Sequence, residues 1–142
     1  MKDIMIKIKG KQFIDNEAED TMEFVTEGQM YERNGSLYYL YDECEFSGFE
    51  NCKTSLKITD DSLRMKRIGK GATFGADLFL KVGERFTTTY KTQVGDMDME
   101  VRTSSLTNNL DAEGYGKVTV DYRISLGGIA DMRNLLEIEI MQ

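Results

Sequence analysis

The stretch that decides the fold is KVTVDYRISL, residues 117–126. Every second residue in it is apolar, and the residues between are polar or charged. Side chains of a strand point alternately to its two faces, so this pattern predicts a strand with one buried and one solvent-facing side. The same period of two returns near both ends of the chain, in Ile4, Ile6 and Ile8 and in Leu136, Ile138 and Ile140.

Turn signals separate such runs at short intervals. Asn34-Gly35 is the strongest, because a type I′ hairpin turn needs a positive φ at both central residues. Residues 15–20 are interpreted as a polar loop, and no segment shows a helical stripe. We predict one all-β domain over residues 1–142, an antiparallel up-and-down barrel in which the first strand pairs with the last and no edge remains. Its ten strands are expected at 3–14, 21–33, 36–47, 53–59, 62–69, 73–82, 85–92, 96–106, 115–127 and 130–141.

Composition and charge exclude several classes of function. The 142 residues include 18 Lys and Arg against 25 Asp and Glu, a net charge of −7, so we expect no nucleic acid partner. Histidine is absent, which removes the usual general base and imidazole zinc ligands. We therefore expect no enzyme, metal or other cofactor. With no secretion signal and no apolar run near ~20 residues, we expect a cytoplasmic protein without membrane contact. There Cys44 and Cys52 would be reduced thiols.

Two motifs that suggest ligand chemistry have simpler interpretations. Asp96, Asp98 and Glu100 share one face of a predicted strand and could hold Ca²⁺ through their oxygens. Alternation along a barrel strand already explains them as a solvated outer face. Residues 69–75 are rich in glycine, but a strand rather than a helix is predicted to follow them. Without a helix N-terminus we expect a turn or bulge there, and no phosphate site.

Several different short motifs follow one another along the chain in a defined order. They are Thr26-Glu27-Gly28, Tyr41-x-Glu43 before Ser47-Gly48, Lys53-Thr54-x-Leu56-Lys57-Ile58, Arg67-x-Gly69, Tyr90-x-Thr92 with Gly95, Tyr122 and Asn134. In this order the chain resembles the uncharacterised YwiB-like family, a domain-of-unknown-function family of calycin-like β-barrel proteins from bacteria. Residues 93–95 lack the family's frequent proline, and Asn51-Cys52 replaces a common glycine, which affects turns only. The resemblance implies a barrel similar to lipocalins or fatty-acid-binding proteins, and no activity.

Four residues are candidates for a ligand site inside the barrel: Arg67, Tyr90, Glu43 and Asn134. Arg67 shares the apolar parity of its strand, so its permanently charged guanidinium should point inward and needs an acceptor. That acceptor is either internal, such as Glu43 or the Tyr90 hydroxyl, or a ligand carboxylate or phosphate. Asn134 should also point inward, to tie the last strand to its neighbours or to line the site. Glu27 and Glu43 could form a carboxylate pair, but Glu27 lies on the expected solvent side.

Two functions are consistent with these features. One is a non-catalytic protein that binds a small, partly apolar or anionic ligand in its barrel. The alternative is a structural or protein-interaction module whose barrel is filled by side chains and which acts through its outer surface. The volume left inside the barrel discriminates between the two.

The third predicted strand is apolar on both parities, so either orientation leaves aromatic rings outside. Contiguous apolar patches on a surface usually mark interfaces. We therefore expect a homodimer through the second and third strands. Its patch would consist of Tyr39 and Tyr41 or of Tyr38, Leu40 and Phe46, extended by Tyr31 and Val25.

Overall fold

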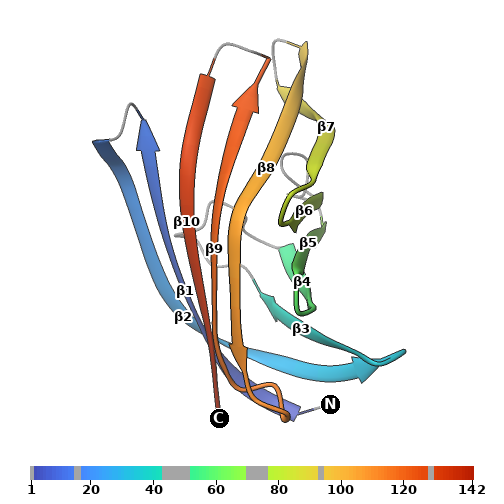
Figure 1. Ribbon diagram of the computed structural model, residues 1–142. Coiled ribbons are helices and arrows are strands. Elements are labelled where there is room, and N and C mark those ends of the chain that lie inside the picture. Colours follow the sequence, from blue (N-terminus) through green and yellow to red (C-terminus); the bar gives the residue numbers. More distant parts are fainter. Residues whose placement is uncertain (1, 15–16, 43–51, 70–76, 93–94, 128–129) are drawn as a thin grey trace.

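A computed structural model describes residues 2–14, 17–42, 52–69, 77–92, 95–127 and 130–142. They form ten antiparallel strands in one sheet, as predicted (Figure 1). The strands are β1 (Lys2–Ile14), β2 (Glu17–Arg33), β3 (Ser36–Asp42), β4 (Cys52–Ile58), β5 (Ser62–Gly69), β6 (Asp77–Lys81), β7 (Arg85–Thr92), β8 (Gly95–Leu110), β9 (Gly116–Leu126) and β10 (Ala130–Met141). The described residues contain no helix long and apolar enough to cross a membrane.

The first and last strands pair, which confirms the predicted closure at the chain ends. In the antiparallel ladder between β1 and β10, Ile6 lies opposite Ile140 and Ile8 opposite Ile138. The isoleucines are buried on the same face, so matched apolar alternation fixes the register. Neither terminal strand is an edge, because the order across the sheet is β6-β5-β4-β3-β2-β1-β10-β9-β8-β7.

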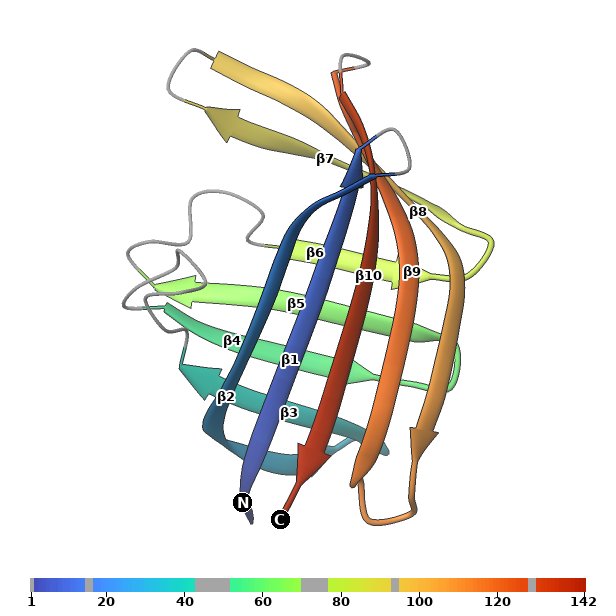
Figure 2. The same cartoon turned by 90° about the vertical axis from the view of Figure 1, so that its left-hand side faces the viewer.

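The expectation that closure removes every edge is wrong. Within the described residues β6 and β7 form no ladder, so a seam runs between them. It is crossed near Val82, which forms an isolated parallel bridge with Thr103 of β8. There the Gly83 amide donates to the Thr103 carbonyl over 3.4 Å. Figure 2 shows that β7 and the first half of β8 turn away from β6. The barrel is therefore nearly, but not completely, closed.

Two walls enclose the core. Strands β1, β2, β9 and β10 run steeply in the front wall of Figure 2 and cross β3–β6 behind them. The largest fully buried side chains come from both walls and lie between them: Tyr39, Ile6, Leu56, Leu63, Leu80, Ile138, Ile140, Val101, Val118, Val120 and Thr54. Tyr39 and Tyr41 are thus interior, and Tyr38 and Leu40 lie on the outer, half-buried parity of β3.

Several predicted boundaries were wrong. Residues 17–20 belong to β2, so the polar loop expected at 15–20 is too long. β8 continues to Leu110, beyond the predicted end at residue 106. The sequence pattern missed this extension because a bulge between Thr103 and Ser105 shifts the register and interrupts the alternation. Of the predicted third strand, residues 43–47 lie outside the described residues, as do residues 73–76 of the sixth.

Candidate functional site

One end of the barrel is closed by the β8–β9 hairpin. The Tyr39 hydroxyl, fully buried under this hairpin, donates to the Gly114 carbonyl over 2.7 Å. Gly114 has a φ of 94°, and a Cβ there would lie 2.7 Å from the Met30 sulfur and 3.0 Å from the Tyr39 hydroxyl. Burial raises the pKa of Tyr39 to about 12, with smaller contributions from Asp111 and Tyr115.

Side-chain hydrogen bonds fix this hairpin to the rest of the barrel. The Asp111 carboxylate accepts from the amides of Glu113 (2.9 Å) and Tyr115 (3.1 Å), which shapes the turn. The Asn108 amide group donates to the Thr59 carbonyl in the β4–β5 turn over 3.0 Å. The hairpin is thus bonded to β3 through Tyr39 and to the β4–β5 turn through Asn108, and it lies over this end of the barrel.

Polar side chains gather on the interior of the front wall toward the opposite end. Gln12, Asn134, Tyr122 and Thr103 are successive register partners on β1, β10, β9 and β8. We call these four residues the front polar row. Tyr122 and Thr103 are buried, and Gln12 and Asn134 are half-buried. The Gln12 amide nitrogen lies 3.0 Å from the Met132 sulfur.

A second row lies on the other wall. Tyr41, Thr54 and Arg67 are successive register partners on β3, β4 and β5, close to the ends of these strands away from the β8–β9 hairpin. We call Tyr41 and Thr54, whose side chains are both described, the back polar row. Thr54 is fully buried and Tyr41 nearly so. Tyr41 contacts Phe24 of β2, with ring centroids 6.3 Å apart.

The candidate residues from the sequence are only partly described. Arg67 and Tyr90 lie in β5 and β7, but their side chains, like the whole of Glu43, lie outside the described residues. Asn134 is half-buried on the parity of Leu136, and its amide donates to the Met132 carbonyl of its own strand over 3.3 Å. The inward guanidinium of Arg67 and a ligand role for these residues stay predictions.

The acidic strand shows the predicted alternation. Asp96 and Asp98 are exposed on β8, whereas Met99 and Val101 are buried. The third acid, Glu100, forms ion pairs with Arg102 (2.8 Å) and Arg85 (3.2 Å). Among the described residues no His, Cys, Asp and Glu side chains group in a way that could hold a metal ion.

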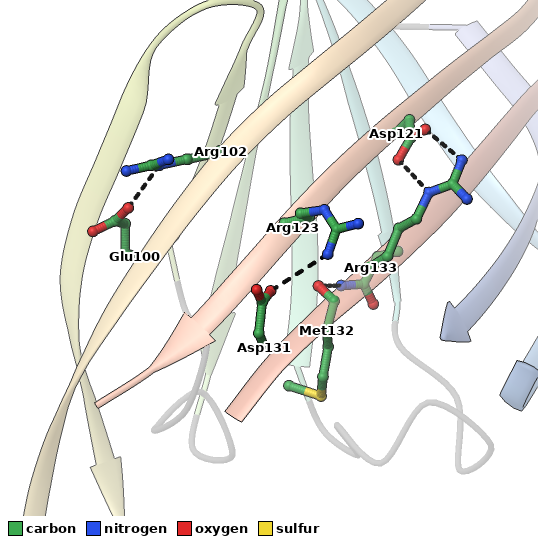
Figure 3. A network of polar contacts seen from close by, with 8 residues as sticks. Glu100, Arg102, Asp121, Arg123, Asp131, Met132 and Arg133 are labelled. Atoms are coloured by element: carbon green, nitrogen blue, oxygen red, sulfur yellow. Dashed lines mark hydrogen bonds and ion pairs between the residues drawn. The ribbon is translucent and has the colours of Figure 1, made fainter. Parts of the chain in front are cut away.

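Sequence reasoning missed a row of arginines outside the barrel. Arg85, Arg102, Arg123 and Arg133 are successive register partners on β7, β8, β9 and β10. Like charges directly opposite one another destabilise a sheet, so such a row needs compensation. Figure 3 shows carboxylates interleaved with the last three arginines, and Glu100 also pairs with Arg85. The pairs are Glu100–Arg102, Asp131–Arg123 at 3.8 Å and Asp121–Arg133 at 2.8 Å. The row is therefore largely neutralised within the protein.

These features define a class of protein: a ten-stranded antiparallel barrel with a hairpin over one end, a seam between two strands, and interior polar rows toward the other end. Within this class the chain belongs to the family described as a domain of unknown function, DUF1934, which matches residues 6–138. The resemblance to the YwiB-like family is confirmed. The chain is similar to the crystal structure of the ywiB protein from Bacillus subtilis, with a TM-score of 0.69 and 20% identity over 96% of this chain and 90% of that one. At that identity the likeness concerns the fold. No curated protein matches the chain.

Proposed function

We propose that this protein is a non-catalytic, cytoplasmic barrel that binds a small, partly apolar anion at the end of the barrel away from the β8–β9 hairpin. The observation that carries the proposal is the segregation of the interior. Side chains such as Ile6, Leu56 and Val118 fill the middle of the barrel. The two polar rows lie toward one end. Ligand pockets combine mostly apolar walls with a few placed polar groups.

Arg67 supplies the charge in this proposal. On β5 it follows Leu63 and Met65, which are both buried, at the next position of the same parity. It also lies opposite Thr54, which is fully buried. A guanidinium at that position matches a carboxylate or phosphate in a bidentate manner. The hydroxyl groups of both rows add neutral hydrogen-bonding partners around the anion.

The test uses 8-anilinonaphthalene-1-sulfonate, an apolar fluorescent anion, as the probe. We expect the folded wild-type protein to bind this probe. Arg67→Met should weaken binding by about 10-fold or more, because one charge-assisted hydrogen bond to the probe is lost. Arg64→Met is the matched control, because Arg64 lies on the same strand but on the outward, half-buried parity. It should bind the probe like the wild type.

Two results would overturn this function. One is a folded protein that binds neither this probe nor decanoate in titration calorimetry. The other is equal binding by the Arg67→Met and Arg64→Met variants. Either result favours the alternative, a filled barrel that acts through its outer surface. Native mass spectrometry of the protein purified from its own cells then shows whether a small molecule accompanies it.

A further inference from the structure

Gly10 lies well inside β1, on the inward parity between the buried Ile8 and the half-buried Gln12. A glycine inside a strand weakens it, because glycine has more freedom to lose on folding and no side chain to pack. Such a glycine usually serves a bulge or bend, the close approach of another chain segment, or the close approach of a ligand. The backbone and the contacts at position 10 distinguish between these roles.

Neither the backbone nor the packing requires a glycine there. Gly10 is not among the described glycines with a positive φ, and its register with Leu136 and Met22 is unbroken. Among the described residues, a Cβ added at position 10 would meet only the terminal methyl group of Met22, at 3.9 Å. Gly28 of β2 is different, because a Cβ there would lie 2.6 Å from the Leu40 carbonyl oxygen. Packing therefore explains Gly28, whereas the described side chains leave the space in front of Gly10 unfilled.

The side chains around this space form a mostly apolar slot, which we call the Gly10 niche. Met22 on β2 and Leu136 on β10 flank it across the strands, and Ile8 and Gln12 flank it along β1. The niche lies on the inner face of the front wall, where Figure 2 shows β1 between β2 and β10. Ile8, on the side of the β8–β9 hairpin, is buried, whereas Gln12 on the other side is half-buried. The niche therefore opens toward the end of the barrel away from that hairpin.

Two amide side chains border the niche on its open side. Gln12 and Asn134 are register partners in the front polar row, one position of the same parity beyond Gly10 and Leu136. The Gln12 amide nitrogen lies 3.0 Å from the Met132 sulfur, and a thioether is a weak acceptor. A ligand oxygen would replace this contact with a stronger hydrogen bond. Apolar walls with a few polar groups at the rim are typical of a small-molecule site.

We propose that the Gly10 niche holds a planar aromatic ring, so that the ligand of this barrel is an aromatic anion. The inference rests on the proposed function, because it identifies the apolar part of the same ligand. Without a side chain, position 10 offers flat backbone against which a ring can lie in contact. The Met22 thioether then lies beside the ring, where sulfur and aromatic groups attract each other. A flexible alkyl chain gains no such contact and loses more conformational freedom on binding.

Filling the niche tests the proposal, with titration calorimetry of 2-naphthoate as the measurement. Gly10→Leu should weaken binding of 2-naphthoate by about 10-fold or more, because the new side chain occupies the place of the ring. Gly10→Ala adds a single methyl group and should weaken binding less. Both variants should unfold at no lower temperature than the wild type, since a strand is stabilised when it loses a glycine. Thr21→Leu is the matched control, because it adds an apolar side chain on the exposed, outward face of β2, and it should bind like the wild type.

Decanoate separates this proposal from the proposed function, because it shares the carboxylate of 2-naphthoate and differs in the apolar part. The wild type should bind 2-naphthoate about 3-fold or more tightly than decanoate. Equal or tighter binding of decanoate overturns the aromatic ring and leaves the proposed function intact. So does a Gly10→Leu variant that binds 2-naphthoate like the wild type, or one that unfolds at a lower temperature because the space is already filled. A folded wild type that binds neither compound overturns both proposals.

Discussion

Tyr39 illustrates how one buried polar atom is accommodated in this barrel. Its ring is part of the core, and its hydroxyl meets the Gly114 carbonyl at 2.7 Å. A buried hydroxyl without a partner would be costly, so this bond compensates for burying the phenol. The same burial disfavours the phenolate, which is why the pKa of Tyr39 rises to about 12 from an ordinary 10.0.

Tyr39 should therefore make stability depend on alkaline pH. The unfolded phenol ionises near pH 10.0 and the folded one near 12, so the free energy of unfolding falls as pH rises through that range and is unaffected below it. Tyr39→Phe should cost about 1–2 kcal/mol at neutral pH, through the lost hydrogen bond. Its deficit against the wild type should shrink between pH 10 and 12, as followed by urea unfolding.

Tyr38→Phe is the control for that measurement, because Tyr38 lies on the outer parity of the same strand. It should change the free energy of unfolding by less than about 0.5 kcal/mol. A deficit of Tyr39→Phe that stays constant from neutral pH to pH 12 would contradict the linkage.

At the scale of elements, the β8–β9 hairpin packs over one end of the barrel, where Gly114 lies against Tyr39 and Met30. Its turn fits only because position 114 carries no side chain and adopts a positive φ. Gly35, in the β2–β3 hairpin, has a similar φ of 79°, but a Cβ added there would meet nothing within 4 Å. The two glycines thus separate backbone strain from steric collision.

Gly114→Ala should destabilise the protein more than Gly35→Ala. Both variants incur the strain of an alanine at positive φ, about 1 kcal/mol. Only at position 114 must Met30 and Tyr39 also move, which adds about 1–3 kcal/mol of overpacking. Thermal and urea unfolding of the two variants measure the difference. Equal destabilisation would mean that the hairpin shifts without resistance and does not seal the barrel.

For the molecule as a whole, the sequence predicts those features that follow from the alternation of apolar residues and from the turn residues between strands. Alternating residues and turns predict ten strands, and the isoleucines at both ends predict the pairing of β1 with β10. The Tyr39–Gly114 bond joins residues 75 positions apart, and no local pattern announces it. The arginine row is equally invisible, since its members come from four different strands. The end of β8 was missed because its bulge moves the apolar residues to the other parity.

The polar rows inside the barrel were predicted only in outline. Parity placed Asn134 on the interior side of β10, where its strand neighbour Leu136 is buried. Thr103 and Gln12 carried no signal of their own, and Thr54 stood out only as part of a family motif. Polar residues become a row only when register sets them side by side. The seam was also unforeseen, since a short turn at Gly83-Glu84 normally joins two paired strands.

The seam between β6 and β7 means that the order of strands in the sheet is a rotation of their order in the sequence. Starting at β7 and continuing through β10 to β1 and on to β6, every strand would pair with its immediate successor. Only the β1–β10 ladder spans the length of the chain, and a linker from Gln142 to Lys2 would turn it into a hairpin. A chain rewired in this way, opened between Gly83 and Glu84, gives up no strand pairing.

This circular permutant should reach the native circular dichroism spectrum and refold faster than the natural chain in stopped-flow experiments, because its contacts are more local. The matched control uses the same linker but opens the chain between Asn34 and Gly35, which makes the β2–β3 ladder the long-range one. That version should gain no speed. If both permutants refold alike, the seam has no bearing on the order in which the barrel assembles.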